Sequence, residues 1–321
     1  MKALRFHQPG KVRDVLAVED IPIPVAADGH VLVRVYAAAV NPSDVKNVAG
    51  AFPETTLPRV PGRDFAGTVE AGNDAWKGME VFGTAAHIGS ESDGSHAEYV
   101  VVPEDAIVRK PTSLTMVQAA SVGVPYVTAS EGLRRARLAA GHQLLIVGGT
   151  GAVGRAVAQI GKWSGARVIA TTENMSLVDE SAKRAVDEWI DLHHEKLEDG
   201  TRRATAGAGV DVAFNVVGGP TIAETLGGLA RGGRLIAISA TKDPNVTFDL
   251  RHFYHQQLEL IGVDSLKLDD RAIVRLLQGL LPGFDAGALR VSIGAEVPLS
   301  EGPSAYLDVE AGRAGKRVLI P

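Results

Sequence analysis

The chain has 321 residues, a formal net charge of −5 at pH 7 and no cysteine. Its length suits about two domains of ordinary size. Without cysteine the chain has neither disulfides nor thiolate metal ligands. The lack of a basic block argues against nucleic acid or an anionic membrane as a partner, and no apolar run approaches the roughly 18 residues of a spanning helix. We expect a globular, cytoplasmic protein.

Short strands and turns are predicted up to about residue 110. The opening stretch MKALRFHQPG alternates as a strand does and lacks the apolar core of a signal peptide. Gly and Pro separate the further strand candidates, so we expect a compact antiparallel domain with a closed or nearly closed sheet. These candidates are residues 30–40, 64–72, 80–84 and 97–103.

From about residue 113 strands and helices alternate. Helices are predicted at 115–121 and 127–137, and each later strand candidate is an apolar run, which is typical of a parallel, doubly wound α/β sheet. Six strands fit a complete dinucleotide-binding unit. The strand candidates are residues 143–147, 167–171, 188–192, 210–217, 234–239 and 258–263.

The last 60 residues leave this alternation. We predict two helices, in 269–281 and 300–312, and a final strand at 316–320. We expect residues 264–321 to return to the first domain, which gives a catalytic domain of residues 1–122 and a nucleotide-binding domain of residues 123–263.

A glycine-rich turn follows the buried strand candidate QLLIV. Gly149, Gly151 and Gly154 match the pattern GxGxxG and precede an amphipathic helix. In such a turn the glycines allow a tight bend, close approach to a pyrophosphate and close helix packing. We therefore expect a dinucleotide here; the alternative is a glycine-rich turn without a ligand. The predicted contacts are Thr150, Gly151, Ala152, Val153 and Gly154.

The end of the next strand gives conflicting signals about the cofactor. A carboxylate there would hold the ribose hydroxyls of NADH, but the strand ends in the neutral Thr171 and Thr172. A small neutral residue leaves room for the 2′-phosphate of NADPH. However, no Lys or Arg lies between Arg167 and Lys183, and Glu173 would repel a phosphate. We predict NADPH, with NADH as the alternative.

Motifs along the whole chain resemble one family. They are VNPSDVK, LPRVPGRDFAGTV, GSHAEYVVVP, SVGVPYVTA, the glycine turn, FNVVGG, ARGGRLIAIS and GKRVLI. The chain thereby resembles the zinc-free quinone oxidoreductase (zeta-crystallin-like) branch of the medium-chain dehydrogenase/reductase superfamily. The resemblance implies a GroES-like β-rich catalytic domain, a Rossmann domain, a homodimer formed through an edge strand, and hydride transfer to a quinone or an α,β-unsaturated carbonyl.

The resemblance also implies that no catalytic metal is bound. Zinc alcohol dehydrogenases of the superfamily have Cys where VNPSD begins and His-Glu where this chain has Arg63-Asp64. An arginine stays protonated and cannot ligate a metal, and a catalytic zinc needs about three protein ligands. The nine histidines are scattered, and we interpret His193-His194 as a solvent-facing pair.

Lys46 is the candidate catalytic donor. In NPSDVK, Pro42 fits the first turn of a short helix with Asn41 as its cap. Some enone reductases of the family have Lys in this motif, which implies that Lys46 contacts the nicotinamide ribose and the substrate oxygen. The alternative is a solvated surface lysine. Asp44 either orients Lys46 or caps the turn through a backbone amide, and we favour the cap.

The remaining cofactor contacts follow from the resemblance and from strand ends. Thr128 matches a residue beside the nicotinamide, or else bonds to backbone at a helix start. Tyr126 either points into the cleft or is a buried aromatic. Two cofactor contacts of relatives, a Lys and a Tyr, are replaced by Leu177 and Leu192, so either other groups hold the 2′-phosphate or the enzyme is less selective. The further predicted contacts are Asn41, Val217, Ser239, Ala240, Val263 and Lys316. For Lys316 the alternative is a plain surface lysine.

Three functions remain open. The first is an NAD(P)H-dependent reductase of small-molecule quinones or enones. The second is an enoyl-thioester reductase, which needs a basic patch for the CoA phosphates that the sequence does not reveal. The third is a non-catalytic protein that binds or senses NADPH on the same fold.

Overall fold

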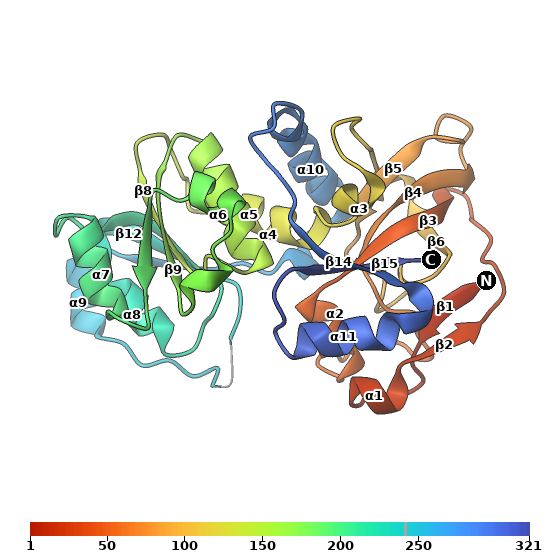
Figure 1. The fold of residues 1–321 in the computed structure, drawn as a ribbon, viewed down its shortest axis with the longest axis horizontal. Coiled ribbons are helices and arrows are strands. Elements are labelled where there is room, and N and C mark those ends of the chain that lie inside the picture. Colours follow the sequence, from red (N-terminus) through yellow and green to blue (C-terminus); the bar gives the residue numbers. More distant parts are fainter. Residues whose placement is uncertain (241–242) are drawn as a thin grey trace. The chain divides into compact units, whose positions relative to one another are not determined.

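A computed structural model describes residues 1–240 and 243–321 of the chain. The chain forms two compact units, which are described one at a time (Figure 1). Unit 1 contains Met1–Val127, Leu266–Gly287 and Val291–Pro321, and unit 2 contains Thr128–Ser265 and Ala288–Arg290.

Unit 1 is built on a seven-stranded sheet that consists of β3 (His30–Val40), β4 (Asp64–Ala71), β5 (Glu80–Thr84), β6 (Tyr99–Pro103), β7 (Val108–Arg109), β14 (Ile293–Pro298) and β15 (Lys316–Ile320). The central strand β3 pairs antiparallel with β4, β6 and β15. The strands predicted before residue 110 and the final strand are confirmed. Figure 1 shows β14 and β15, from the end of the chain, beside β3.

β14 was not predicted, and its sequence explains why. Its side chains alternate only between half-buried and exposed positions, and it contains Gly294 and ends at Pro298. Its parallel pairing with β15 makes it a strand, which is a long-range effect that its own residues do not reveal. A second, two-stranded sheet pairs β1 (Lys2–Arg5) with β2 (Ala17–Asp20).

Two large apolar clusters, and a smaller one around Ala3, Val60 and Ala97, stabilise unit 1. One lies under the sheet, where alternate residues of β3 such as Val31 and Val33 are fully buried. The other joins β15 to two helices through Val48, Tyr306 and Leu319. The helices of unit 1 are α1 (Val12–Val15), α2 (Pro42–Val48), α3 (Met116–Ala119), α10 (Asp270–Asp285) and α11 (Gly302–Glu310). Unit 1 also has short 3₁₀ turns at Glu104–Ala106 and Leu299–Glu301, and a third, Ser265–Lys267, begins at the last residue of a unit 2 segment.

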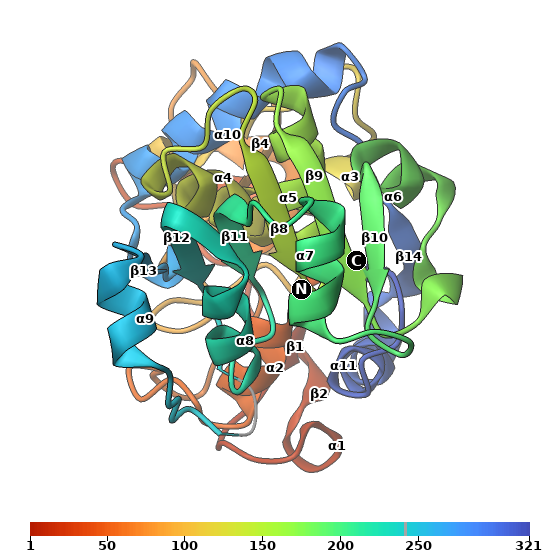
Figure 2. The same cartoon turned by 90° about the vertical axis from the view of Figure 1, so that its left-hand side faces the viewer.

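Unit 2 is built on a six-stranded sheet that consists of β8 (Gln143–Val147), β9 (Arg167–Thr172), β10 (Glu188–Asp191), β11 (Val210–Asn215), β12 (Leu229–Ala237) and β13 (Glu259–Gly262). The strand order is β10-β9-β8-β11-β12-β13, and every neighbouring pair is parallel. Figure 2 shows these strands side by side. The six predicted strands and the doubly wound topology are thus confirmed.

Helices cover both faces of this sheet. On one face, Leu145 and Leu235 belong to an apolar cluster with side chains of α7 (Leu197–Ala204) and α8 (Thr221–Gly227). On the other face, Leu144 packs against Gly161 of α5 (Ala152–Trp163), because neighbouring residues of a strand point to opposite faces. The remaining helices are α4 (Gly123–Arg135), which crosses from unit 1 into unit 2, α6 (Glu180–Ala185), α9 (Leu250–His255) and the 3₁₀ turn Met175–Leu177.

The described part of the chain contains no helix that is both long and apolar enough to span a membrane.

Candidate cofactor and active site

The glycine turn joins β8 to α5, and its three motif glycines differ in what surrounds them. A Cβ at Gly149 would lie 2.7 Å from the Ala170 Cβ, and a Cβ at Gly154 would lie 2.2 Å from the Gly148 carbonyl oxygen. The protein's own packing therefore requires glycine at both positions. At Gly151 the nearest such atom is 3.8 Å away and φ is −73°, which any residue adopts. Nothing within the turn itself requires glycine at 151.

The first turn of α5 exposes backbone donors at this same place. Gly151 is the N-cap of the helix and has no side chain to bond the first amides. The amides of Ala152, Val153 and Gly154 have no acceptor within the helix, and Gly151 and Ala152 are exposed. A helix N-terminus with free N–H groups and room at the cap fits a pyrophosphate. The residues present therefore fit the dinucleotide that the sequence predicts.

Thr171 and Thr172 hold the turn and the loop after β9. The Thr171 hydroxyl accepts a hydrogen bond from the Gly148 amide at 3.0 Å, and the Thr171 carbonyl accepts one from the Gly149 amide at 2.9 Å. The Thr172 hydroxyl accepts from the Asn174 amide and donates to the Asn174 carbonyl. Both side chains are buried, so their hydroxyls already have partners within the protein.

The ends of β11, β12 and β13 bring the other predicted contacts of unit 2 to one edge of the sheet. A Cβ at Gly218 would lie 2.1 Å from the Ser239 carbonyl oxygen, so the segments after β11 and β12 touch. The Val263 amide donates to the Ala237 carbonyl at 2.9 Å. The carboxyl edge of a parallel sheet is where such folds bind ligands. Val217 and Ala240 lie in the same two segments, after β11 and β12.

The sequence analysis missed Asn215, which shapes this edge. Its side chain is fully buried, and its Oδ1 accepts the amides of Val217 at 3.0 Å and Gly218 at 2.8 Å. Its Nδ2 donates to the hydroxyls of Thr221 and Thr225. An asparagine at the end of a buried strand, three residues before Gly-Gly, is the signal that could have identified it.

Thr128 lies on α4 and is buried. Its hydroxyl donates to the Ser265 hydroxyl at 2.9 Å, which links α4 to the segment after β13. Both residues belong to unit 2.

In unit 1, α2 begins at Pro42 with Asn41 as its N-cap, as predicted. The Asn41 amide donates to Asp44 Oδ2 at 2.7 Å. The favoured role of Asp44, a cap bonded to a backbone amide, is therefore confirmed. Lys46 lies in the last turn of the same helix and is exposed.

Asn41, Asp44, Asp64 and Lys316 form a buried polar cluster in unit 1. Asn41 Nδ2 donates to Asp64 Oδ2 at 3.0 Å, and Lys316 Nζ donates to Asn41 Oδ1. Lys316 Nζ also lies 3.9 Å from Asp64 Oδ2, and Asp64 Oδ1 accepts the Val124 amide at 2.9 Å. Lys316 is only 9% exposed, so its alternative interpretation as a surface lysine is wrong.

Burial moves the pKa values of two members of this cluster. Desolvation raises the pKa of Asp44 to about 7, against the hydrogen bond from the Asn41 amide, which lowers it. Desolvation lowers the pKa of Lys316, against the carboxylates of Asp64 and Asp44, which raise it. Each shift favours the neutral form of a group withdrawn from water. The cluster thus fixes Asn41 through charges that have little contact with solvent.

Comparison with known proteins matches both units to families. Residues 27–112 match the alcohol dehydrogenase GroES-like domain, and residues 152–278 match the zinc-binding dehydrogenase family. The chain is 38% identical over 296 residues to a zinc-type alcohol dehydrogenase-like protein of Schizosaccharomyces pombe, which covers 91% of this chain and 87% of that protein. It is 29% identical to quinone oxidoreductase of Mus musculus, over 100% of this chain and 98% of that protein.

Two further matches agree with these. The chain is 34% identical to the chloroplastic NADPH-dependent alkenal/one oxidoreductase of Arabidopsis thaliana, over 76% of this chain and 64% of that protein. The crystal structure of an alcohol dehydrogenase superfamily protein from Novosphingobium aromaticivorans has a TM-score of 0.88 at 28% identity, over 99% of both chains. The chain belongs to the medium-chain dehydrogenase/reductase superfamily, in its quinone oxidoreductase branch. The protein is therefore an oxidoreductase. Unit 1 is its GroES-like domain and unit 2 is its Rossmann domain.

Arg63 and Asp64 stand where the sequence analysis places the His-Glu of zinc-dependent relatives. Arg63 is buried, and its Nε donates to the Ala85 carbonyl at 3.2 Å. Across residues 1–240 and 243–321, no three His, Cys, Asp or Glu side chains are grouped so that they could hold a metal ion. His193 and His194 are exposed, as predicted. Of the two interpretations of Tyr126, the buried aromatic is confirmed, because its ring is buried with its centroid 5.2 Å from that of Phe284.

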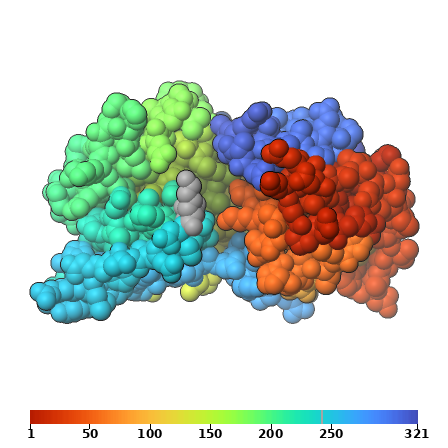
Figure 3. Space-filling model, turned by 90° about the horizontal axis from the view of Figure 1, so that it is seen from below, coloured from red at the N-terminus to blue at the C-terminus, as the bar shows by residue number. Residues whose placement is uncertain are grey.

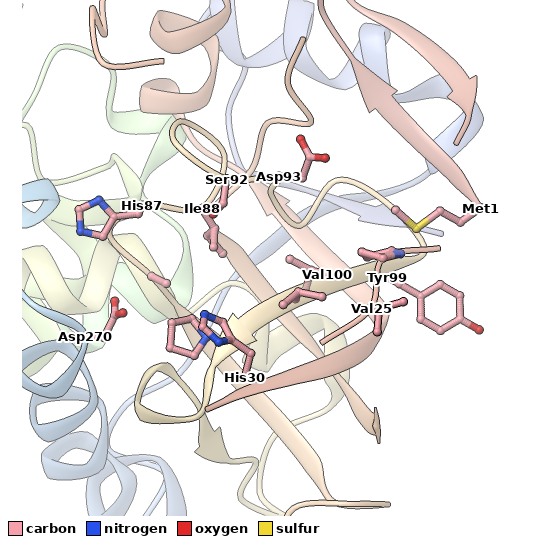
Figure 4. Close-up of a pocket in the computed structure, with 14 residues that line it drawn as sticks. Met1, Val25, His30, His87, Ile88, Ser92, Asp93, Tyr99, Val100 and Asp270 are labelled. Carbon is pink, nitrogen blue, oxygen red and sulfur yellow. The ribbon is translucent and has the colours of Figure 1, made fainter. Parts of the chain in front are cut away.

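The reductase also has a pocket of about 480 Å³ within unit 1. Figure 4 shows it lined by apolar side chains, such as Ile88 and Val100, together with His87. His87 Nδ1 is hydrogen-bonded to Glu91 Oε1 at 2.8 Å. The pocket shares no lining residue with the buried polar cluster, and we place no step of a reaction there.

Proposed function

We propose that this protein is an NADPH-dependent reductase of quinones and α,β-unsaturated carbonyl compounds. The observation that carries the proposal is the open N-terminus of α5, where Gly151 leaves room and free amides for a pyrophosphate. The names of its relatives, quinone oxidoreductase and alkenal/one oxidoreductase, support the acceptor class. The reduced nicotinamide supplies the hydride.

We propose cofactor contacts at the residues that the sequence analysis predicts. In unit 2 the first turn of α5 binds the pyrophosphate, and the edge formed by the ends of β9, β11, β12 and β13 binds the remainder of the dinucleotide. The proposed residues are Asn41, Thr128, Thr150, Gly151, Ala152, Val153, Gly154, Thr171, Thr172, Val217, Ser239, Ala240, Val263 and Lys316.

Lys46 is the proposed catalytic residue. When hydride adds to the acceptor carbon, negative charge develops on the acceptor oxygen, and a preorganised donor stabilises it by roughly 3–4 kcal/mol. Lys46 is exposed and follows a helix start fixed by Asn41 and Asp44. We assign its ammonium group as that donor.

We propose that the reaction needs no zinc. Arg63 cannot ligate a metal, and the chain has no cysteine to supply the thiolate that zinc-dependent members use. With Lys46 as oxyanion donor, the chemistry of an activated acceptor requires no Lewis acid.

We also propose that the protein works in the cytoplasm as a homodimer joined through β13. This strand is one of the two edges of the parallel sheet, with β10 at the other, and an unpaired edge is a template for a second strand. Leu260 on β13 is 42% exposed, and Leu250 and Tyr254 on the neighbouring α9 are 65% and 59% exposed. Figure 3 shows the α9 segment, in light blue, on the surface of unit 2. Light scattering should give the mass of a dimer, and a monomer would contradict this arrangement.

The activity is tested by mixing the purified protein with NADPH or NADH and a panel of quinones, enones and an enoyl-CoA. We expect oxidation of the nicotinamide with quinones and enones, undiminished by a chelator. Preference for the enoyl-CoA would instead identify a thioester reductase. Tight NADPH binding with no turnover on any acceptor would identify a non-catalytic nucleotide-binding protein.

A further inference from the structure

The last residue of β9, Thr172, carries no charge that would distinguish NADPH from NADH. In a dinucleotide-binding unit this strand end meets the adenosine ribose, where a carboxylate favours the 2′-hydroxyl and a nearby arginine accommodates a 2′-phosphate. Thr172 stands here, and its hydroxyl is already bonded to the backbone of Asn174. No Lys or Arg occurs between Arg167 and Lys183. A cation for the 2′-phosphate must therefore come from another element.

Arg155, in the first turn of α5, reaches this region. Its Nε donates to the Thr150 carbonyl in the glycine turn at 2.9 Å, and its NH2 donates to the Leu177 carbonyl in the loop after β9 at 2.8 Å. The side chain is 18% exposed. Arg155 thus joins the two segments that enclose the adenosine ribose in this fold. The resemblance described above implies a lysine at the position of Leu177 in relatives, and in this chain Arg155 brings a cation to the same loop.

Asp179 compensates the charge of Arg155. Arg155 NH1 lies 2.6 Å from Asp179 Oδ2, while Asp179 Oδ1 caps α6 by accepting the Ala182 amide at 2.9 Å. Partial burial acts to raise the pKa of Asp179, but the Ala182 amide and the Arg155 guanidinium outweigh it and lower that pKa. The carboxylate is therefore charged at neutral pH, and it reduces the attraction that Arg155 exerts on a phosphate.

We propose that Arg155 recognises the 2′-phosphate of NADPH and that its ion pair with Asp179 keeps this recognition weak, so that the enzyme binds NADPH and NADH with similar affinity. A guanidinium has five N–H donors, and the three hydrogen bonds above leave two for a phosphate. The inference rests on the proposed function, because it assumes that unit 2 binds a nicotinamide dinucleotide. It makes Asp179 a residue that determines cofactor selectivity without touching the cofactor.

Binding of the adenosine half alone tests the proposal without turnover. Isothermal titration of the full-length protein with 2′,5′-ADP and with 5′-AMP measures how much the 2′-phosphate adds. In the unmodified protein we expect less than about a tenfold preference for 2′,5′-ADP, since a partly exposed charge compensated by a carboxylate adds little. Asp179→Asn keeps an oxygen to cap α6 and removes the charge. It should strengthen 2′,5′-ADP binding about fivefold and leave 5′-AMP binding unchanged.

A matched control removes an equal charge that is paired with the same helix, α5. Asp187 pairs with Lys162 in the last turn of α5, about 10 Å along the axis from Arg155. Asp187→Asn should leave the preference for 2′,5′-ADP unchanged. Arg155→Gln should abolish the preference, with NADPH and NADH binding equally well when titrated by tryptophan fluorescence.

Three results would overturn the inference. They are a preference above a hundredfold in the unmodified protein, no change in Asp179→Asn, and a change in Glu173→Gln that Asp179→Asn does not reproduce. In the last case the exposed Glu173 at the strand end would be the selecting group. Failure of NADPH and NADH to bind at all would contradict the proposed function instead, so the two failures are distinguishable.

Discussion

The glycine turn of unit 2 and the buried polar cluster of unit 1 present polar groups in opposite ways. The turn offers backbone amides at an exposed helix start, and glycine keeps the space beside them open. The cluster instead buries two carboxylates and an ammonium around one amide side chain. A site made of backbone donors costs the protein little stability, whereas buried charges are tolerated only as long as each retains its partners. Variants of the two regions should therefore fail differently.

The largest effect should come from breaking the buried cluster. Lys316→Met leaves the Asp64 carboxylate without its cation in a fully buried position, so we expect a loss of about 3–5 kcal/mol in the free energy of unfolding. Adding Asp64→Asn should recover part of that loss, because no unpaired charge then remains. Urea unfolding of both variants measures this. The matched control is Lys183→Met at an exposed ion pair, and a similar loss there would remove the distinction between the two lysines.

The glycine turn should lose function without losing stability. Gly151→Ser adds a side chain that can cap α5, so the free energy of unfolding should stay the same or rise by a few tenths of a kcal/mol. The same hydroxyl accepts hydrogen bonds from the amides that we assign to the pyrophosphate, and it fills the space beside them. Because each hydrogen bond to a charged group contributes about 1.5–3 kcal/mol, NADPH affinity should fall on the order of a hundredfold. Fluorescence titration measures the NADPH affinity, and thermal unfolding measures the stability. Unchanged affinity would mean that Gly151 is not part of the binding site.

Lys46 should affect turnover rather than folding. Lys46→Met removes an exposed ammonium and keeps most of the length of the side chain, so kcat should fall roughly a hundredfold or more with little change in the thermal midpoint. Asp44 and Asn41, which start α2, are left intact. Steady-state kinetics with an enone gives the comparison, and wild-type kcat in this variant would make Lys46 a surface residue only.

A smaller, pH-dependent effect should come from Asp44. The folded pKa of about 7 lies above the ordinary value of 3.8, so the contribution of Asp44 to stability is fully present below pH 4 and is lost as the pH rises through 7. Asp44→Asn mimics the neutral acid. Its stability relative to the unmodified protein should therefore increase by about 2–3 kcal/mol between pH 5 and pH 8. Urea unfolding at the two pH values tests this, and a constant difference would contradict the raised pKa.

The two regions also differ in how far the sequence predicts them. The glycine turn and the six strands of unit 2 are local signals, because buried parallel strands are continuous apolar runs and a dinucleotide turn is a contiguous motif. The buried polar cluster combines the start of α2 with β4 and the last strand, β15. No periodicity relates Asn41 to Lys316, so their contact emerges only when β15 pairs with β3.

The same reasoning applies to the residues that the sequence analysis left open or missed. Asn215 and Arg155 each act through hydrogen bonds to backbone groups of neighbouring loops. The backbone path of a loop cannot be predicted from its residue types, so these hydrogen bonds cannot be predicted either. β14 was missed because a strand paired on one side, with half-exposed side chains, lacks the apolar run of a central strand.

The central claim is that hydride passes directly from the nicotinamide to an organic acceptor, with a protein donor rather than a metal ion stabilising the oxygen. The most direct test follows deuterium from NADPH labelled at nicotinamide C4 into an enone product, in the presence of a chelator. We predict deuterium at the product carbon and an unchanged rate. Label absent from that carbon, or activity lost with the chelator and restored by zinc, would contradict the account.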